Sequence, residues 1–206
     1  MTINTVDDFQ QATSASGEVC QALQIYADVL KKWQAKINLV GPNTIPELWA
    51  RHMLDSAQLA PFIPPRSRVV DLGSGAGFPG LVLAIMQKNQ GIDVHLVESD
   101  QRKCAFMREA NRLTEAGATI HNERIESLAP LKADVITSRA LARIEKLITL
   151  GDIHRLSTGK YLFLKGQRWR EELTEARKHW MIELKDHPSR TDAAGRILEI
   201  LETESL

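Results

Sequence analysis

Three closely spaced glycines after an apolar run are the first feature of this sequence with chemical consequences. The segment Val69–Gly80 reads V-V-D-L-G-S-G-A-G-F-P-G and places Gly73, Gly75 and Gly77 directly after residues typical of a buried strand. Glycine lets the backbone turn sharply there and lets a ligand approach it closely. Open α/β sheets bind their ligands at the carboxyl ends of the strands, and this segment lies at such an end. The spacing therefore predicts a ligand-binding loop.

A carboxylate stands at a matching position after the next apolar run. Glu98 follows that run, 25 residues after Gly73, and a carboxylate there can accept hydrogen bonds from both hydroxyls of a ribose. The spacing G-x-G-x-x-G that begins at Gly75 also satisfies the dinucleotide fingerprint. The glycines alone therefore leave three interpretations open: a nicotinamide cofactor, another nucleoside-containing cofactor, and an ordinary turn between a strand and a helix.

Asp71, two residues before Gly73, favours a cationic ligand over a diphosphate. A carboxylate at this strand end would interact with loop amides, or through water with a cation, whereas beside a pyrophosphate it would be repulsive. S-adenosylmethionine carries a sulfonium and an ammonium group and no phosphate. The pattern D-x-G-x-G-x-G with an acid after the next strand resembles motif I of the class I S-adenosylmethionine-dependent methyltransferases. A dehydrogenase would also require hydride-transfer groups, such as a Tyr-x-x-x-Lys pair.

The sequence also bears on the atom that would accept a methyl group. Cys20 and Cys104 lie outside the segments after the fourth and fifth expected strands, where the nucleophile for methylation of a pyrimidine carbon would stand. The turn after the fourth strand reads T-S-R-A-L, without the N/D-P-P-aromatic pattern that holds an exocyclic amine. An acceptor that is already nucleophilic, such as guanine N7, has no proton to lose and relies on proximity and orientation. The sequence favours an acceptor of this kind.

Several further motifs, together with the glycine segment, resemble one family. They are Trp33 through Leu39, Arg51-His52-x-x-Asp55-Ser56, Phe78-Pro79-Gly80, Ser138-Arg139-Ala140 and Leu164-Lys165-Gly166. The family is the bacterial small-subunit ribosomal RNA methyltransferase G, also called glucose-inhibited division protein B, and the resemblance spans about residues 23–201. It implies a cytoplasmic enzyme that transfers a methyl group from S-adenosylmethionine to N7 of a guanine in 16S ribosomal RNA, guanine 527 in the family. The implied partner is 16S ribosomal RNA or the small ribosomal subunit.

The resemblance also implies positions for the cofactor. These are Gly73 and Phe78 in the loop, Ile125 and Glu126 after the third strand, and Arg139. An apolar side chain beside an acceptor or a backbone amide would suit the adenine at residues 125–126. On the spacing of motif I, the predicted cofactor site also includes Asp71, Gly75, Gly77 and Glu98, with Glu98 at the ribose.

Arg139 and Lys165 are the predicted catalytic cations. Arg139 follows the fourth strand and can bind the cofactor carboxylate or hold the substrate, and Lys165 is expected to face the RNA. Arg51, His52 and Asp55 have two interpretations. They face the substrate, or Arg51 and Asp55 pair one helical turn apart while His52 is structural. Methylation of N7 requires no base, so His52 is not needed as one.

The elements that must position these residues follow from hydrophobic periodicity. The apolar pattern of residues 1–65 predicts a helical extension that ends at a proline-rich boundary. One helix is expected over 19–40 and a second from 43 or 44 to 60. Residues 66–206 predict a class I methyltransferase domain, because strands and helices alternate. The expected strands cover 68–72, 94–98, 118–122, 133–137, 160–164, 180–185 and 196–201, and the expected helices cover 78–88, 102–113, 144–156 and 168–178. The fold class is α/β, a mostly parallel seven-stranded sheet whose last strand is antiparallel.

Composition limits the function classes further. The chain has 206 residues, 43% hydrophobic and 25% charged, with 26 basic and 26 acidic side chains. These values exclude a disordered chain and a uniformly basic nucleic-acid binder. The charge is uneven, since residues 102–178 hold 16 Lys or Arg and 10 Asp or Glu. This region is a phosphate-binding face or a set of solvated helix faces. A small-molecule methyltransferase and a cofactor-binding module without catalysis remain alternatives.

We expect a cytoplasmic monomer without a membrane or metal partner. Residues 1–11 lack the basic start and apolar run of a secretory signal. The longest strongly apolar stretch, Leu81–Met86, is far shorter than a membrane-spanning helix. Cys20 and Cys104 are isolated, which predicts neither disulfides nor a zinc site.

Overall fold

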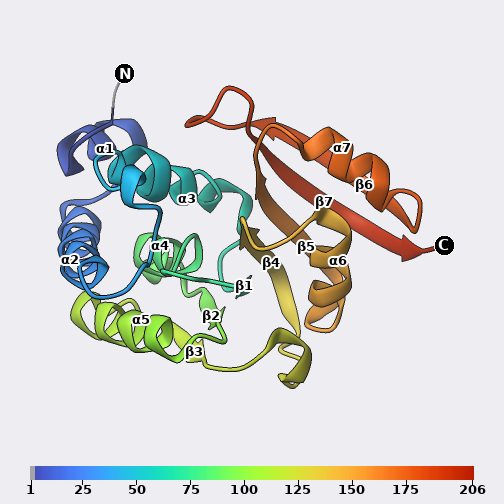
Figure 1. Cartoon of the computed structure of the whole chain (residues 1–206), viewed down its shortest axis with the longest axis horizontal. Coiled ribbons are helices and arrows are strands. Elements are labelled where there is room, and N and C mark those ends of the chain that lie inside the picture. Colours follow the sequence, from blue (N-terminus) through green and yellow to red (C-terminus); the bar gives the residue numbers. More distant parts are fainter. Residues whose placement is uncertain (1–2) are drawn as a thin grey trace.

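A mixed seven-stranded sheet forms the centre of the structure, a computed structural model that describes residues 3–206 (Figure 1). Its strands are β1 (Arg68–Leu72), β2 (Asp93–Val97), β3 (Thr119–His121), β4 (Ala133–Arg139), β5 (Arg155–Lys165), β6 (Trp180–Pro188) and β7 (Arg196–Ser205). Their order across the sheet is β3-β2-β1-β4-β5-β7-β6. Strands β1 to β5 pair in parallel, whereas β7 runs antiparallel to both β5 and β6. The predicted α/β sheet with an antiparallel last strand is confirmed.

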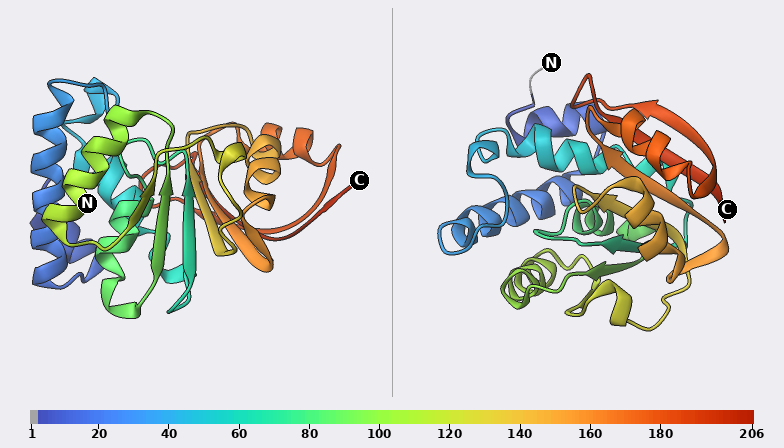
Figure 2. Two further views of the ribbon diagram at one scale, coloured as in Figure 1. Left: turned by 90° about the horizontal axis from the view of Figure 1, so that it is seen from below. Right: turned by 45° about the vertical axis from the view of Figure 1, so that its right-hand side comes forward.

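Helices cover both faces of this sheet. They are α1 (Val6–Thr13), α2 (Gly17–Gln34), α3 (Asp55–Ala57), α4 (Gly80–Met86), α5 (Gln101–Thr114), α6 (Ile144–Asp152) and α7 (Trp169–Ala176). Figure 1 shows α2, α4 and α5 on one side and α6 and α7 on the other, and Figure 2 shows the sheet between them. Successive strand residues face opposite ways, so Val69 packs with the first group of helices and Val70 with the second.

The strand order reverses between β1 and β4. From β1 the chain continues to β2 and β3 on one side, and from β4 it continues to β5 on the other. The connections that leave the carboxyl ends of β1 and β4 therefore diverge, and open α/β sheets bind ligands in the resulting crevice. The glycine loop, residues 73–79, follows β1, and Arg139 ends β4. The topology thus brings two predicted parts of the site to one crevice.

The N-terminal helical segment differs from the prediction in its boundaries. Helix α2 ends at Gln34 rather than at Val40. The Gln34 side chain accepts hydrogen bonds from the N–H groups of Leu39 and Val40, at 3.0 and 3.1 Å, and so turns the chain. The expected second helix is broken into η1 (Pro42–Thr44), the π-helical turn η2 (Trp49–Leu54), α3 and η3 (Ala60–Phe62). Helix α1 is not among the predicted helices.

Helix α6 also ends earlier than predicted. It stops at Asp152 rather than at Leu156, and β5 starts directly afterwards, at Arg155. The N–H of Ala133 donates a hydrogen bond of 2.7 Å to the carbonyl of His154. This bond joins the chain to the start of β4 and ends the helical path. Two further short helical turns are η4 (Lys88–Gln90) and η5 (Ile125–Ser127).

The N-terminal segment and the sheet share one hydrophobic cluster. Phe9 and Tyr26 from the segment are buried together with Leu81 of α4. The division into residues 1–65 and 66–206 stays a prediction, and the first two residues of the former lie outside the described part of the chain.

Residues 3–206 contain neither a helix suited to span a membrane nor a group of side chains suited to hold a metal ion. None of their helices combines the length and the apolar character that a membrane span requires. No three of their His, Cys, Asp or Glu side chains are grouped so that they could hold a metal ion. Cys20 and Cys104 are buried free thiols.

Candidate cofactor and acceptor site

The glycine loop folds back directly after β1. Gly73, Gly75 and Gly77 have φ values of +66°, +58° and +88°, in the left-handed region that glycine adopts without steric cost. The N–H of Ser74 donates to the carbonyl of Val97 at 3.1 Å, and the N–H of Gly77 donates to the carbonyl of Ser74 at 2.7 Å. The Ser74 bond therefore joins the loop to the end of β2, and the Gly77 bond closes a turn within the loop.

Glu98 lies against this loop, just after β2. Its Oε2 accepts a hydrogen bond of 2.9 Å from the N–H of Gly75, and its Oε1 accepts one of 2.8 Å from the N–H of Asp100. Each carboxylate oxygen has two lone-pair positions. Both oxygens therefore keep one position that can receive a hydroxyl group of a ligand.

Asp71 is completely buried beneath the loop. Its carboxylate accepts hydrogen bonds from the N–H of Gly80 at 3.2 Å and from the hydroxyl of Thr137 at 2.9 Å. Burial raises the pKa of Asp71 to about 6, although these hydrogen bonds oppose the shift. The expected contact of Asp71 with a backbone amide is therefore present, at the N–H of Gly80.

A first cavity, of about 260 Å³, opens beside Gly73. Four of the predicted cofactor residues line it together, namely Gly73, Glu98, Ile125 and Glu126. Glu126 is half-exposed and lies 3.7 Å from Lys146. The other loop residues and Asp71 do not line this cavity and instead support the loop. The structure therefore brings together the ends of β1 and β2, as the spacing of motif I predicts, and the connection after β3, as the resemblance implies.

His154, which the sequence does not single out, contacts Ile125, a residue that lines the first cavity. Its Nε2 lies 3.0 Å from the carbonyl of Ile125, so Nε2 carries the hydrogen. His154 is fully buried, and its Nδ1 has no hydrogen-bond partner among the described residues. Its ring therefore fixes the backbone of η5 at Ile125.

Arg139 lies between Phe78 and the segment η2–α3. Its guanidinium carbon is 5.0 Å from the centroid of the Phe78 ring, a cation–π distance. Its Nη1 donates to the carbonyl of Arg51 at 2.9 Å and lies 3.4 Å from Oδ2 of Asp55. Its Nη2 lies 2.8 Å from Nδ1 of His52. The N-terminal segment therefore sets the orientation of this cation.

His52 is a neutral acceptor in this arrangement. Arg139 has only donors, so Nδ1 of His52 accepts and Nε2 carries the hydrogen. Nε2 lies 2.7 Å from the hydroxyl of Thr44, which itself donates to the carbonyl of Gly41 at 2.7 Å. Burial lowers the pKa of His52 to about 3, with the charges of Arg139 and Arg51 acting in the same direction. The lone pair on Nδ1 of His52 therefore already accepts a hydrogen bond from Arg139.

Arg51 and Asp55 do not pair with each other, so that interpretation is wrong. The Arg51 side chain is exposed and lies 3.4 Å from the Glu47 carboxylate. Asp55 accepts a hydrogen bond of 2.6 Å from the hydroxyl of Thr191, in the turn between β6 and β7, besides its contact with Arg139. Asp55 thus links the cation at the end of β4 to the C-terminal hairpin.

A second cavity, of about 480 Å³, opens beside Arg139. Lys165 also lines it, and of the three candidate substrate residues on η2–α3 only Asp55 does. The Nζ of Lys165 lies 2.6 Å from the Glu172 carboxylate and donates to the carbonyl of Ala142 at 2.8 Å. The two predicted catalytic cations therefore meet in one cavity, although the Lys165 side chain is only 7% exposed.

Leu141 separates the two cavities. Leu141 and Ala142 line both of them. A Cβ atom added to Gly73 would lie 2.6 Å from Cδ1 of Leu141. The leucine side chain therefore covers this glycine, and yet it is 39% exposed. No signal in the sequence around Leu141 marks it as a dividing wall.

The sequence does contain one Tyr-x-x-x-Lys spacing, at Tyr161 and Lys165. Both residues stand on β5, where residues four apart are about 13 Å from each other. The Tyr161 hydroxyl donates to Asp152 at 2.5 Å, and Lys165 pairs with Glu172. The two side chains therefore do not form a hydride-transfer pair.

Comparison with known proteins decides the family. The model of the family described as "GidB: rRNA small subunit methyltransferase G" matches residues 19–196. The chain belongs to this family. It is 54% identical to the ribosomal RNA small subunit methyltransferase G of Paramagnetospirillum magneticum, with 92% of each chain covered. It is 48% identical to that of Gluconobacter oxydans, with 91% of this chain and 96% of the relative covered. The GidB resemblance noted in the motifs is confirmed.

Solved structures of distant proteins share the fold of this GidB family member. The structure of M. jannaschii TYW2 in complex with AdoMet matches with a TM-score of 0.57 at 14% identity, covering 84% of this chain and 80% of that one. Precorrin-6y C5,15-methyltransferase from Geobacter metallireducens matches with a TM-score of 0.53 at 14% identity, covering 80% and 91%. Such low identities show the fold alone. The predicted class I methyltransferase fold is confirmed.

Proposed function

We propose that this chain transfers a methyl group from S-adenosylmethionine to N7 of a guanine in 16S ribosomal RNA. One observation carries the proposal: a cavity with Gly73 and Glu98 and a cavity with Arg139 and Lys165 meet at Leu141. A methyl donor and its acceptor must lie within reach of each other. A nucleoside-type pocket and a cationic pocket on either side of one leucine suit that requirement. Membership of the GidB family supports the same reaction.

The first cavity fits S-adenosylmethionine better than a dinucleotide. A dinucleotide needs free backbone N–H groups at the loop for its diphosphate. Here the N–H groups of Ser74, Gly75 and Gly77 are all bonded within the protein. Glu98 keeps acceptor positions for ribose hydroxyls, and Ile125 offers an apolar surface beside them. When bound, S-adenosylmethionine supplies an electrophilic methyl carbon on a sulfonium.

The groups around Arg139 suit an acceptor that loses no proton. Nδ1 of His52 is engaged by Arg139, and the low pKa keeps this ring neutral. Asp55 accepts hydrogen bonds from Arg139 and Thr191. A guanine N7 attacks through a lone pair in the ring plane and needs no base. The contribution of the chain is then to hold the ring nitrogen in line with the bond that breaks.

The charge of the second cavity supports an RNA substrate. Its lining includes four cationic side chains, Arg139, Arg143, Lys165 and Arg196, against three carboxylates, Asp55, Glu172 and Asp192, so that cations are in excess by one. Guanidinium and ammonium groups bind phosphate oxygens through charge-assisted hydrogen bonds. We therefore include 16S ribosomal RNA, as part of the small ribosomal subunit, as the partner of a monomeric enzyme.

Methyl transfer in vitro tests this proposal. The purified protein is incubated with S-adenosylmethionine that carries a tritiated methyl group and with small subunits from cells that lack the gene. The ribosomal RNA is then digested to nucleosides and separated. We expect tritium in 7-methylguanosine. A parallel incubation contains a small-molecule extract of the same cells, and tritium there but not in RNA would support a small-molecule methyltransferase. Cofactor binding without transfer to either would support a module without catalysis.

A further inference from the structure

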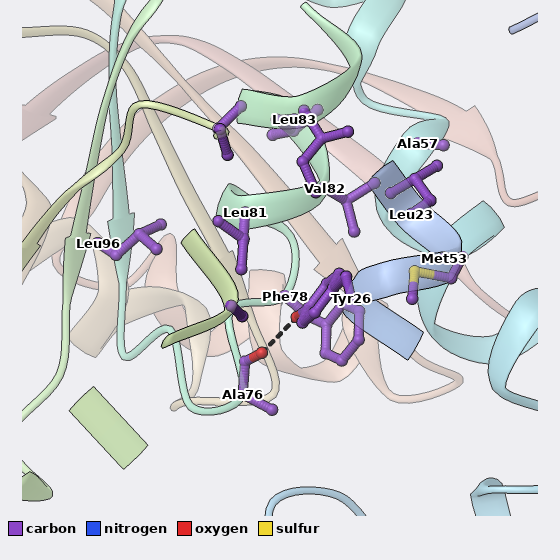
Figure 3. Close-up of a cluster of buried hydrophobic side chains, with 14 of the residues drawn as sticks. Leu23, Tyr26, Met53, Ala57, Ala76, Phe78, Leu81, Val82, Leu83 and Leu96 are labelled. Atoms are coloured by element: carbon purple, nitrogen blue, oxygen red, sulfur yellow. Dashed lines mark hydrogen bonds between the residues drawn. The ribbon is translucent and has the colours of Figure 1, made fainter. Parts of the chain in front are cut away.

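Tyr26 connects helix α2 to the glycine loop. Its hydroxyl donates a hydrogen bond to the carbonyl of Ala76, 50 positions later in the chain (Figure 3). Tyr26 is completely buried, and Ala76 is nearly so. Burial raises the pKa of the Tyr26 hydroxyl well above its ordinary value, so this group remains a donor at any working pH.

The Tyr26 ring packs tightly around the same loop. Its centroid lies 5.2 Å from that of Phe78 and 6.2 Å from that of Phe106. A Cβ atom added to Gly77 would lie 3.0 Å from the Tyr26 hydroxyl oxygen. Figure 3 shows Tyr26 beside Phe78, with the dashed bond to Ala76. The absence of a side chain at Gly77 therefore makes room for the hydroxyl.

The contact acts on the part of the loop that meets Glu98. The N–H of Gly75 binds the Glu98 carboxylate, and the next residue along the chain, Ala76, gives its carbonyl to Tyr26. The N–H of Gly77 closes the turn onto Ser74. Adjacent backbone groups of the loop are thus held from β2 on one side and from α2 on the other.

We propose that Tyr26 is a positioning residue for cofactor binding, which holds the Ala76 carbonyl so that the Gly75 N–H stays on Glu98. The identity of the cofactor rests on the proposed function. The positioning itself rests on the geometry of Tyr26, Ala76 and Gly77. Helix α2 is then part of the cofactor site, although none of its residues lines the first cavity.

Removal of one hydroxyl tests this proposal, with a matched control. Tyr26→Phe keeps the ring and deletes the donor, and Tyr161→Phe deletes another buried hydroxyl, which donates to Asp152 on α6. We expect the Kd for S-adenosylhomocysteine and the KM for S-adenosylmethionine to rise about three- to tenfold in Tyr26→Phe, with kcat at saturating cofactor within about twofold of wild type. Tyr161→Phe should leave Kd and KM unchanged. Equal values in wild type and Tyr26→Phe would overturn the proposal.

Amide hydrogen exchange of the cofactor-free protein provides a readout that does not depend on the reaction. In Tyr26→Phe, exchange at Gly75 and Gly77 should accelerate several-fold, while Tyr161→Phe should leave these amides unchanged. Unchanged exchange in Tyr26→Phe would contradict the positioning role. If wild type does not bind S-adenosylhomocysteine, the proposed function fails, and hydrogen exchange still decides the role of Tyr26.

Discussion

Arg139, at the end of β4, donates a hydrogen bond of 2.8 Å to Nδ1 of His52 in the π-helical turn η2. The bond requires a neutral His52 with its hydrogen on Nε2. The carbonyl of Arg51 and the carboxylate of Asp55 contact the other guanidinium nitrogen. The cation above Phe78 is therefore placed by residues 84 to 88 positions earlier in the chain.

His52 should make the fold sensitive to mild acid. Its pKa is lowered from 6.5 to about 3 in the folded protein, so below pH 6.5 the unfolded chain binds a proton that the folded chain does not. The stabilisation is complete above about pH 6.5 and declines toward about pH 3, by at most about 1.4 kcal/mol per pH unit. Urea unfolding of wild type and His52→Gln between about pH 7 and about pH 4.5 measures this. A smaller pH dependence in the variant is expected, and equal dependence would contradict the assignment.

Loss of His52 should slow methyl transfer only modestly. His52→Ala removes one contact of Arg139 and leaves the Arg51 carbonyl and Asp55 in place. Because the proposed transfer to guanine N7 requires no base, we expect kcat/KM for the RNA to fall by no more than about tenfold, well below the loss of a general base. The pH profile should keep its shape. A loss of about a thousandfold with intact cofactor affinity would identify His52 as a base.

An alanine at Gly73 should block cofactor binding sterically. Its Cβ atom would lie 2.6 Å from Cδ1 of Leu141 and so displace this exposed side chain within the lining of the first cavity, which both residues share, and its φ of +66° strains a residue with a side chain. Gly117→Ala is the matched control, since Gly117 has a φ of +76° and open space around it. Both variants should lose about 1–2 kcal/mol of unfolding free energy. Calorimetry should show weakening of S-adenosylhomocysteine binding by about a hundredfold only in Gly73→Ala, and equal binding by the two variants would refute the steric account.

Replacement of Lys165 should weaken the binding of the RNA and leave the binding of the cofactor unchanged. Lys165→Met leaves the Glu172 carboxylate without its cation in a mostly buried place, which should cost about 3 kcal/mol of unfolding free energy. Lys178→Met breaks an exposed pair with Glu175 and should cost no more than about 1 kcal/mol. Kinetics well below the unfolding temperature should show a KM for the RNA that rises at least about tenfold in Lys165→Met alone. A raised KM for the cofactor instead would contradict the assignment.

Much of the first cavity could be predicted because its signals are local. The glycines and the acid after the next strand each stand in a fixed relation to one strand, whereas the pair after the third strand was predicted from the family resemblance. The sheet then brings Gly73, Glu98 and Ile125 together. The parallel sheet itself followed from alternating periods of two and of about 3.6 residues.

The residues that the sequence did not reveal act across long distances in the chain. Tyr26 looks like one more apolar residue of an amphipathic helix, and its contact with Ala76 exists only after α2 has packed. His154 likewise reaches Ile125 across 29 positions. The end of α2 depends on a side-chain bond of Gln34 that interrupts an otherwise helical pattern. Periodicity does not encode such contacts.

The most direct test of the central claim is mass spectrometric mapping of 16S ribosomal RNA from cells with and without this gene. The account predicts that one guanine carries an N7-methyl group in the parent and loses it, with a mass decrease of about 14 Da in the fragment, when the gene is deleted. A plasmid copy of the gene should restore the methyl group, and a Gly73→Ala copy should not. An identical guanine-N7 methylation pattern in parent and deletion strain would contradict the account.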